Sequence, residues 1–251
     1  EEVVEMSEAE LIAELDRLED PQVTVRRLFK RQGGIEGSIW FTDARVALLY
    51  ERGFFEVPGF MDAEAAEALE EEALSDDRSG ALAPASLSST DVERSDRVRF
   101  LAAGEAEGSD AASSSSASAS AVSPAGLGVR TALSALRRLQ SEAAQVLTLA
   151  GRRELQLALY RPAETGYERH RDALPSDGGD DGGEYTGRRL TAIVYASDSA
   201  TGAGALRLHL SPAQGGGNVV LEPRRGKAVV FMSGAVDHSV DPSTSVRVAL
   251  T

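Results

Sequence analysis

The sequence predicts an α+β fold in which N-terminal helices support a jelly-roll-like β core. Two observations carry this prediction: apolar residues recur at helical spacing before residue 150, and six short alternating segments follow Gly151. Short strands separated by Gly, Pro, Asp and Ser are typical of a sandwich or barrel. Helices that precede such strands are expected to pack on one outer face of the sheet.

Helices are predicted in the first part of the chain. A capping-box pattern begins at Ser7, and apolar residues then repeat at helical spacing as far as Leu18. The Asp20-Pro21 pair is expected to stop or restart that helix. Further helices are predicted over residues 42–52, after an N-cap at Asp62, and along the amphipathic stretch from Leu133 to Val146.

Strands are predicted where apolar residues alternate along a short segment. One is expected at 54–57 and another around 98–100, with a loop predicted at 75–90 because that stretch is rich in Ser, Ala, Asp and Pro. The six strands after Gly151 are 155–160, 190–195, 205–210, 219–221, 228–232 and 246–250. Residues 104–125 are low-complexity Ser and Ala with almost nothing to bury, which predicts a disordered insertion.

The composition excludes several classes of function. The net charge of −14 disfavours nucleic acid and anionic membranes as partners, because binding to phosphate requires a basic surface. The absence of cysteine excludes disulfides, thiolate metal ligands and a cysteine nucleophile, and it fits a reducing compartment. No apolar run reaches the roughly 18 residues that span a bilayer. A protein partner is compatible with this charge.

Two of the three histidines indicate a metal site. His170 and Asp172 share one side of an extended segment, because residues i and i+2 of a strand point the same way. His238 comes from a later segment that can lie beside the first. Two histidines and one carboxylate leave three coordination positions open, an arrangement that non-haem Fe(II) oxygenases use. His209 lies within a predicted strand and is interpreted as a non-ligand.

Each of these residues also has a simpler interpretation. His170 and Asp172 could merely hydrogen-bond to each other in a loop, and His238 could end a strand for packing reasons.

Arg247 interrupts an apolar strand, where a buried guanidinium needs a carboxylate and suits a bidentate one. An incoming dicarboxylate would supply it, but Arg247 could equally lie on the polar face. The alternation of the strand does not decide between the two positions.

Tyr160 and Tyr195 lie on the predicted strands that flank the segment from His170 to Asp172. On an inward face, each phenol offers a hydrogen-bond donor to a carboxylate. For either residue taken alone, an ordinary core tyrosine is an equally good interpretation.

One continuous stretch and several other segments resemble a known family. Residues 160–172, which end in Gly-Tyr-Glu-Arg-His-Arg-Asp, resemble the Gly-Tyr-x-x-His-x-Asp stretch of the hypoxia-inducible-factor prolyl hydroxylases. Close relatives of these enzymes hydroxylate a proline in the adaptor subunit of SCF ubiquitin ligases in protists. The likeness also includes residues 94–100, 190–195, 204–208, 222–223 and 229–233, and it ends with His238 and Arg247.

The resemblance covers roughly residues 42–251 and implies a catalytic domain built on a double-stranded β-helix, or jelly roll. Residues 1–41 would be an N-terminal helical extension, and residues 104–125 an insertion in the domain. The site that it implies has metal ligands His170, Asp172 and His238, 2-oxoglutarate-binding residues Arg247, Tyr195, Tyr160 and Thr251, and substrate-binding residues Tyr167, Arg94 and Asp96.

The activity that the resemblance implies is the 4-hydroxylation of a proline in a cytoplasmic or nuclear protein, with Fe(II), 2-oxoglutarate, O₂ and ascorbate as cofactors. The SCF adaptor subunit is the first candidate substrate, with an oxygen-sensing role for the enzyme. One alternative is a protein hydroxylase with another target, such as a ribosomal protein or a hypoxia-factor-like peptide. A non-catalytic binding module on the same fold is the other.

Overall fold

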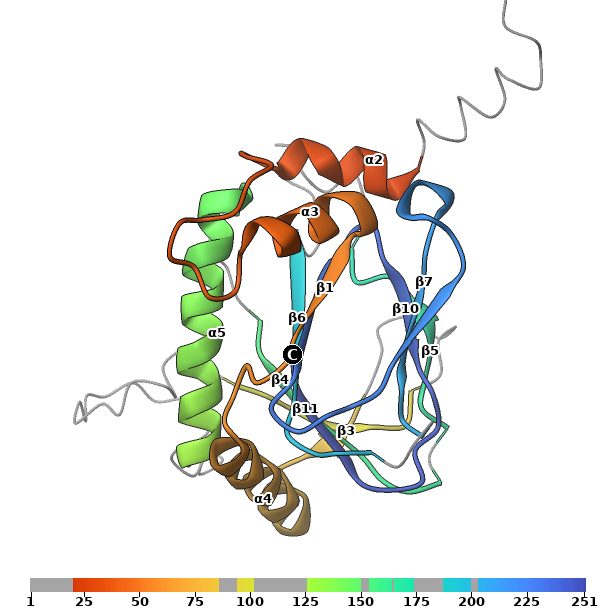
Figure 1. The fold of residues 1–251 in the computed structure, drawn as a ribbon. Helices are drawn as coiled ribbons and strands as arrows, with labels where there is room; N and C mark the ends of the chain where they lie inside the picture. The colour runs from red at the N-terminus through yellow and green to blue at the C-terminus, as the bar shows by residue number, and fades with distance from the viewer. Residues whose placement is uncertain are drawn as a thin grey trace, which may run out of the picture.

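Two antiparallel β-sheets face each other, and helices cover the outer face of the larger sheet (Figure 1). The computed structural model describes residues 20–85, 94–101, 126–149, 154–163, 165–173, 187–199 and 203–251. The helix predicted between Ser7 and Leu18 and the insertion predicted at 104–125 lie outside these residues. Within them, no helix is long and apolar enough to cross a membrane.

The larger sheet has seven strands and the smaller one four. The order in the larger sheet is β1 (Phe54–Val57), β9 (Ala228–Met232), β6 (Leu190–Tyr195), β11 (Arg247–Leu250), β4 (Gln156–Tyr160), β3 (Arg97–Phe100) and β2 (Ala83–Pro84). The order in the smaller sheet is β5 (Tyr167–His170), β10 (Asp237–Val240), β7 (Leu206–His209) and β8 (Asn218–Leu221). From β4 onward the chain passes repeatedly between the two sheets, which confirms the predicted jelly roll.

The helices of the described residues are α2 (Pro21–Val25), η1 (Arg26–Leu28), α3 (Asp43–Arg52), α4 (Ala63–Ser79), α5 (Leu127–Val146) and η3 (Pro212–Gln214). α4 begins after Asp62, whose carboxylate accepts a hydrogen bond from Ala65 N–H at 2.7 Å. It ends at Gly80, which adopts a left-handed φ of +79°. α4 and α5 approach closely because Gly128 has no side chain: a Cβ there would lie 2.1 Å from Leu69 N.

Alternation along the larger sheet builds two separate cores. On β6, Tyr195 packs between the sheets while Val194 packs toward the helices, and Phe231 and Val230 on β9 divide in the same way. The outer core joins the sheet to α4 and α5, as Figure 1 shows for these two helices. The strands that carry the inner core are therefore supported from behind by a helical layer.

The segment around Asp20 is fixed to the connection between β7 and β8. The Asp20 carboxylate accepts hydrogen bonds from Gln22 N–H (2.9 Å), from the Ser211 hydroxyl (2.8 Å) and from Ala213 N–H (3.0 Å). The buried Gln22 side chain donates to the carbonyl of Leu49 at 3.1 Å. A helix thus starts directly after Asp20. The boundary near residue 42, between an N-terminal extension and a catalytic domain, stays a prediction.

The prediction of a loop at residues 75–90 is wrong for its first part, because α4 continues to Ser79 and β2 follows at Ala83–Pro84. Asp76 and Asp77 lie in the last turns of α4 and pair with arginines of β3. Arg99 Nε is 3.1 Å from Asp76 Oδ2, and Arg97 Nε is 2.7 Å from Asp77 Oδ1. These tertiary ion pairs favour helix where the local composition favours a loop.

We predict that Glu72 of α4 stabilises α5 from outside that helix. The Glu72 carboxylate accepts hydrogen bonds from Gly128 N–H (2.7 Å) and Val129 N–H (3.0 Å), two donors that the first turn of α5 leaves unpaired. Glu72→Ala should lower the free energy of unfolding by about 1 kcal/mol, the usual effect of losing a helix cap. Chemical denaturation measures it, with Glu71→Ala, at an exposed position of the same helix, as the control. Equal stability of the two variants would contradict the prediction.

Candidate metal centre

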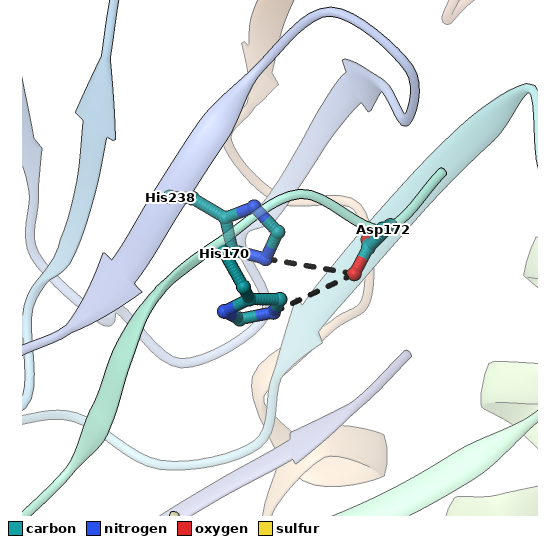
Figure 2. Close-up of side chains that lie close together, drawn as sticks. All are labelled: His170, Asp172 and His238. Atoms are coloured by element: carbon teal, nitrogen blue, oxygen red, sulfur yellow. Dashed lines mark ion pairs between the residues drawn. The ribbon is translucent and has the colours of Figure 1, made fainter. Parts of the chain in front are cut away.

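The three predicted metal ligands converge at the edge of the smaller sheet, facing the space between the sheets. His170 ends β5, Asp172 follows it by two residues, and His238 lies on the neighbouring β10, where it is the direct register partner of His170. Asp172 Oδ1 is 3.6 Å from His170 Nε2 and 3.8 Å from His238 Nε2 (Figure 2). One donor atom from each residue lies within 4.8 Å of the other two.

Both imidazoles are oriented by the backbone. His170 Nδ1 lies 2.8 Å from the carbonyl oxygen of Glu168, and His238 Nδ1 lies 3.3 Å from that of Val236. A ring nitrogen that donates to a carbonyl leaves the other nitrogen unprotonated in the neutral ring. The Nε2 atoms of both histidines face Asp172.

The Asp172 carboxylate faces the two histidines through Oδ1, which also lies 4.0 Å from Arg188 Nη1. Its Oδ2 accepts a hydrogen bond from Thr191 Oγ1 at 2.6 Å, and Thr191 Oγ1 lies 2.8 Å from Ser233 Oγ. Burial alone raises the pKa of Asp172, but the hydrogen bonds from His170 and Thr191 and the charge of His238 together lower it well below its usual range. The carboxylate is therefore ionised at neutral pH.

Arg247 occupies the same space between the sheets. It is only 2% exposed, and its guanidinium carbon lies 4.8 Å from the ring centroid of Tyr160 and 5.2 Å from that of Tyr195. Arg247 Nε and Tyr195 Oη are buried without a hydrogen-bond partner, and no carboxylate among the described residues forms an ion pair with Arg247. The interpretation that placed Arg247 on the polar outer face is thus wrong.

Both tyrosines line this inner space as neutral phenols. Burial raises the pKa of Tyr160 and of Tyr195, and the positive charge of Arg247 only partly offsets that effect. Thr251 lies four residues after Arg247, on the same face of the extended chain, and its backbone pairs with that of Gln156 at 2.8 and 2.9 Å. A role for Thr251 in binding 2-oxoglutarate stays a prediction.

The residues predicted to contact substrate form one continuous group beside the metal ligands. Arg94 donates two hydrogen bonds to the buried carboxylate of Asp96, at 2.7 and 2.6 Å. Its guanidinium lies 4.5 Å from the ring centroid of Tyr167, which in turn stacks on the ring of His170 at 3.8 Å. His209 lies elsewhere: its ring nitrogens are 2.9 Å from Asn218 Oδ1 and 3.1 Å from Ser239 Oγ, as expected of a non-ligand.

Comparison with known proteins agrees with this geometry. The sequence of residues 155–251 matches the model of the 2OG-Fe(II) oxygenase superfamily. The antiparallel strands that the structure describes in this range match the jelly-roll fold of that superfamily. No curated protein matches the chain.

Solved structures with this oxygenase fold include prolyl hydroxylases. A prolyl-4-hydroxylase from Pseudomonas putida is 27% identical, with 82% of this chain and 94% of that chain covered and a TM-score of 0.60. A prolyl hydroxylase from Trichoplax adhaerens, in complex with a hypoxia-inducible-factor degradation-domain peptide, is 18% identical, with 98% and 92% covered and a TM-score of 0.60. The epimerase SnoN from nogalamycin biosynthesis, 17% identical, covers 83% and 79% with a TM-score of 0.51.

The donor set of this oxygenase fold suits Fe(II). Two imidazole nitrogens and one carboxylate oxygen are the ligands of the facial triad of non-haem iron oxygenases. Metal binding requires neutral histidines and an ionised carboxylate. Burial lowers the pKa of His238 to about 4, so that this ring is neutral at pH 7. The family and the triad together support Fe(II) and 2-oxoglutarate as the cofactors.

Two residues beside the candidate metal ligands were not expected from the sequence. Both are buried hydroxyl residues: Thr191 on β6 donates to Asp172, and Ser233, just after β9, lies within hydrogen-bond distance of Thr191. Each is a polar residue within or directly after an otherwise apolar strand. A buried hydroxyl at such a position is expected to have a hydrogen-bond partner. Sequence alone does not indicate that the partner is a metal ligand.

We predict that acid destabilises the metal-free protein through His238. Its pKa of about 4 lies below the ordinary value of 6.5, so the unfolded chain binds a proton that the folded protein does not. The free energy of unfolding should therefore fall as the pH falls from about 6.5 through 4, by at most about 3 kcal/mol from this group. Denaturant titrations across this range measure the effect.

His238→Gln should flatten this dependence on pH, whereas the control His209→Gln, on the outer face, should retain it. The prediction fails if wild type and His238→Gln lose the same free energy of unfolding over that interval.

Proposed function

We propose that this chain is an Fe(II)- and 2-oxoglutarate-dependent dioxygenase that 4-hydroxylates a proline in a protein substrate. One observation carries the proposal. The buried guanidinium of Arg247 has no carboxylate partner among the described residues, and it shares the space between the sheets with the convergent donors of His170, Asp172 and His238. A buried cation is costly unless an anion neutralises it, and 2-oxoglutarate is such an anion.

His170, Asp172 and His238 would hold the metal and leave three positions open on its other face. When bound, Fe(II) and 2-oxoglutarate supply the oxidative decarboxylation that couples formation of succinate and CO₂ to hydroxylation of the substrate. The chain orients these donor atoms before any metal binds. The carbonyls of Glu168 and Val236 orient the two imidazoles, and the Thr191 hydroxyl orients the carboxylate.

Arg247 would bind the distal carboxylate of 2-oxoglutarate. A planar guanidinium pairs with a carboxylate through two parallel N–H···O bonds, and the free Arg247 Nε is one available donor. The unpartnered Tyr195 hydroxyl is a second donor to the same carboxylate. Tyr160, on the other side of the guanidinium, would face the same ligand.

The substrate would approach past Tyr167, Arg94 and Asp96. Arg94 pairs with Asp96 and contacts the ring of Tyr167, and Tyr167 stacks on His170. These contacts would form one wall of the substrate site, next to the metal ligands. The complex of the Trichoplax adhaerens hydroxylase with a peptide supports a protein as substrate. Resemblance in residues 160–172 favours a cytoplasmic or nuclear target.

We propose the SCF adaptor subunit as the first candidate, with an oxygen-sensing role and with ascorbate keeping the iron ferrous. The low-complexity Ser/Ala stretch at 104–125, foreign to the animal enzymes, supports this choice. A hypoxia-factor-like peptide and a ribosomal protein are the alternative substrates. The intact set of metal donors speaks against a non-catalytic binding module.

We predict that Arg247→Ala sharply raises the concentration of 2-oxoglutarate required for turnover. Removing one partner of a desolvated charge pair costs about 2–5 kcal/mol. Succinate release against 2-oxoglutarate concentration gives the KM, and calorimetric titration with Mn(II) should show unchanged metal affinity. The control is Arg207→Ala, because Arg207 pairs with Asp241 and lies on the outer face of the smaller sheet. A KM in Arg247→Ala equal to that of the control would exclude Arg247 from the binding site.

Hydroxylation of the substrate is tested with candidate peptides, Fe(II), ascorbate and 2-oxoglutarate. We expect one added oxygen, about 16 mass units, on a single proline, in step with succinate release, because ferrous iron in the triad drives the oxidation. His170→Ala should abolish both products. Oxygen mapped to Asn, His or Lys, or succinate without a modified peptide, would overturn the prolyl assignment.

A further inference from the structure

One aspartate links the two strands that carry the histidine ligands. Asp237 Oδ2 accepts hydrogen bonds from Arg169 Nε at 3.1 Å and Arg169 Nη2 at 2.6 Å, and Asp237 Oδ1 accepts one from Arg171 Nε at 2.7 Å. Asp237 directly precedes His238, and the two arginines directly flank His170. Three hydrogen bonds thus cross from β5 and its end to β10, next to the metal ligands.

This link lies on the face of the smaller sheet opposite the metal ligands. Consecutive residues of a strand point to opposite faces, and His238 is buried toward the space between the sheets, so Asp237 points outward. Arg169 likewise alternates with His170, and its side chain is 58% exposed. The Asp237 link is therefore on the outer face, and its hydrogen bonds are with Arg169 and Arg171.

The register between β5 and β10 is irregular. β5 is an edge strand whose register with β10 comprises His238↔His170 and Val240↔Tyr167, with an irregularity between them. The other neighbour of β10, β7, is in register with it at four consecutive pairs. The register that sets His170 against His238 is thus interrupted, and the side chains of Asp237, Arg169 and Arg171 add three hydrogen bonds across it.

We propose that Asp237 is a positioning residue that holds β5 in register with β10 and thereby sets the affinity of the triad for a divalent metal. The inference rests on the proposed function, because it assumes that the triad binds a metal. Donor atoms must be held within about 0.5 Å of their productive positions for tight binding. A shift of β5 along β10 moves His170 and Asp172 together relative to His238.

Binding of Mn(II) to the metal-free full chain tests this inference, with free Mn(II) followed by its electron paramagnetic resonance signal. Asp237→Asn retains the shape of the side chain and removes its charge, and it should raise the Kd for Mn(II) about tenfold, the lower end of the usual effect of an outer-shell residue. Asp237→Glu should retain tight binding. The matched control is Asp241→Asn, because Asp241 pairs with Arg207 of β7, a strand without metal ligands.

The possible outcomes separate this inference from the proposed function. If wild type does not bind Mn(II), the proposed function fails. If wild type binds and Asp237→Asn has the same Kd as Asp241→Asn, Asp237 is not a positioning residue. Circular dichroism of the metal-free variants restricts the comparison to folded protein. If Asp237→Asn does not fold, Arg169→Gln and Arg171→Gln each remove the hydrogen bonds of one arginine to Asp237. A raised Kd for Mn(II) in these variants supports the inference. Wild-type affinity in both overturns it.

Discussion

His170 and His238 face each other because β5 and β10 are paired in one register, and the rest of the site depends on that pairing. It brings ligands from distant parts of the chain together and places Asp172, just past β5, within 3.8 Å of both imidazoles. Side chains alternate between the faces of a strand, so a slip of one residue would send either histidine to the outer face. The hydrogen bonds of Asp237 and the stacking of Tyr167 on His170 both stabilise the pairing of β5 with β10, from opposite faces of the sheet.

Arg247 imposes a second constraint, because a cation inside a jelly roll must be compensated. The rings of Tyr160 and Tyr195 provide partial compensation through cation–π contacts, but neither supplies a negative charge. Neutral phenols, held so by burial, leave the positive charge available to an incoming carboxylate. Low-polarity surroundings make an uncompensated Arg247 costly, and under the proposed function they would strengthen its attraction for a dicarboxylate.

The helical layer supports these features without entering the site. α4 and α5 pack on the outer face of the larger sheet, and their contact is tight enough that Gly128 cannot carry a side chain. The structural neighbours show why the fold alone does not name the reaction, since prolyl hydroxylases and an epimerase share it. Under the proposed function, substrate choice would reside beside His170, where Arg94 contacts both Asp96 and Tyr167.

The sequence by itself determined the regular strands and the identities of the donors. Apolar alternation was clear in β4, β6, β9 and β11, and a His-x-Asp pair with a later histidine and a strand arginine pointed to the ligands. β5 and β10 gave no such signal, because their residues are mostly polar or charged. They become strands through tertiary pairing, β5 with β10, and β10 with β5 and β7. Only the tertiary structure placed Arg247 between the sheets. The alternation of β11 fits either orientation, and because Val248 packs in the core that joins the sheet to the helices, Arg247 faces the other way.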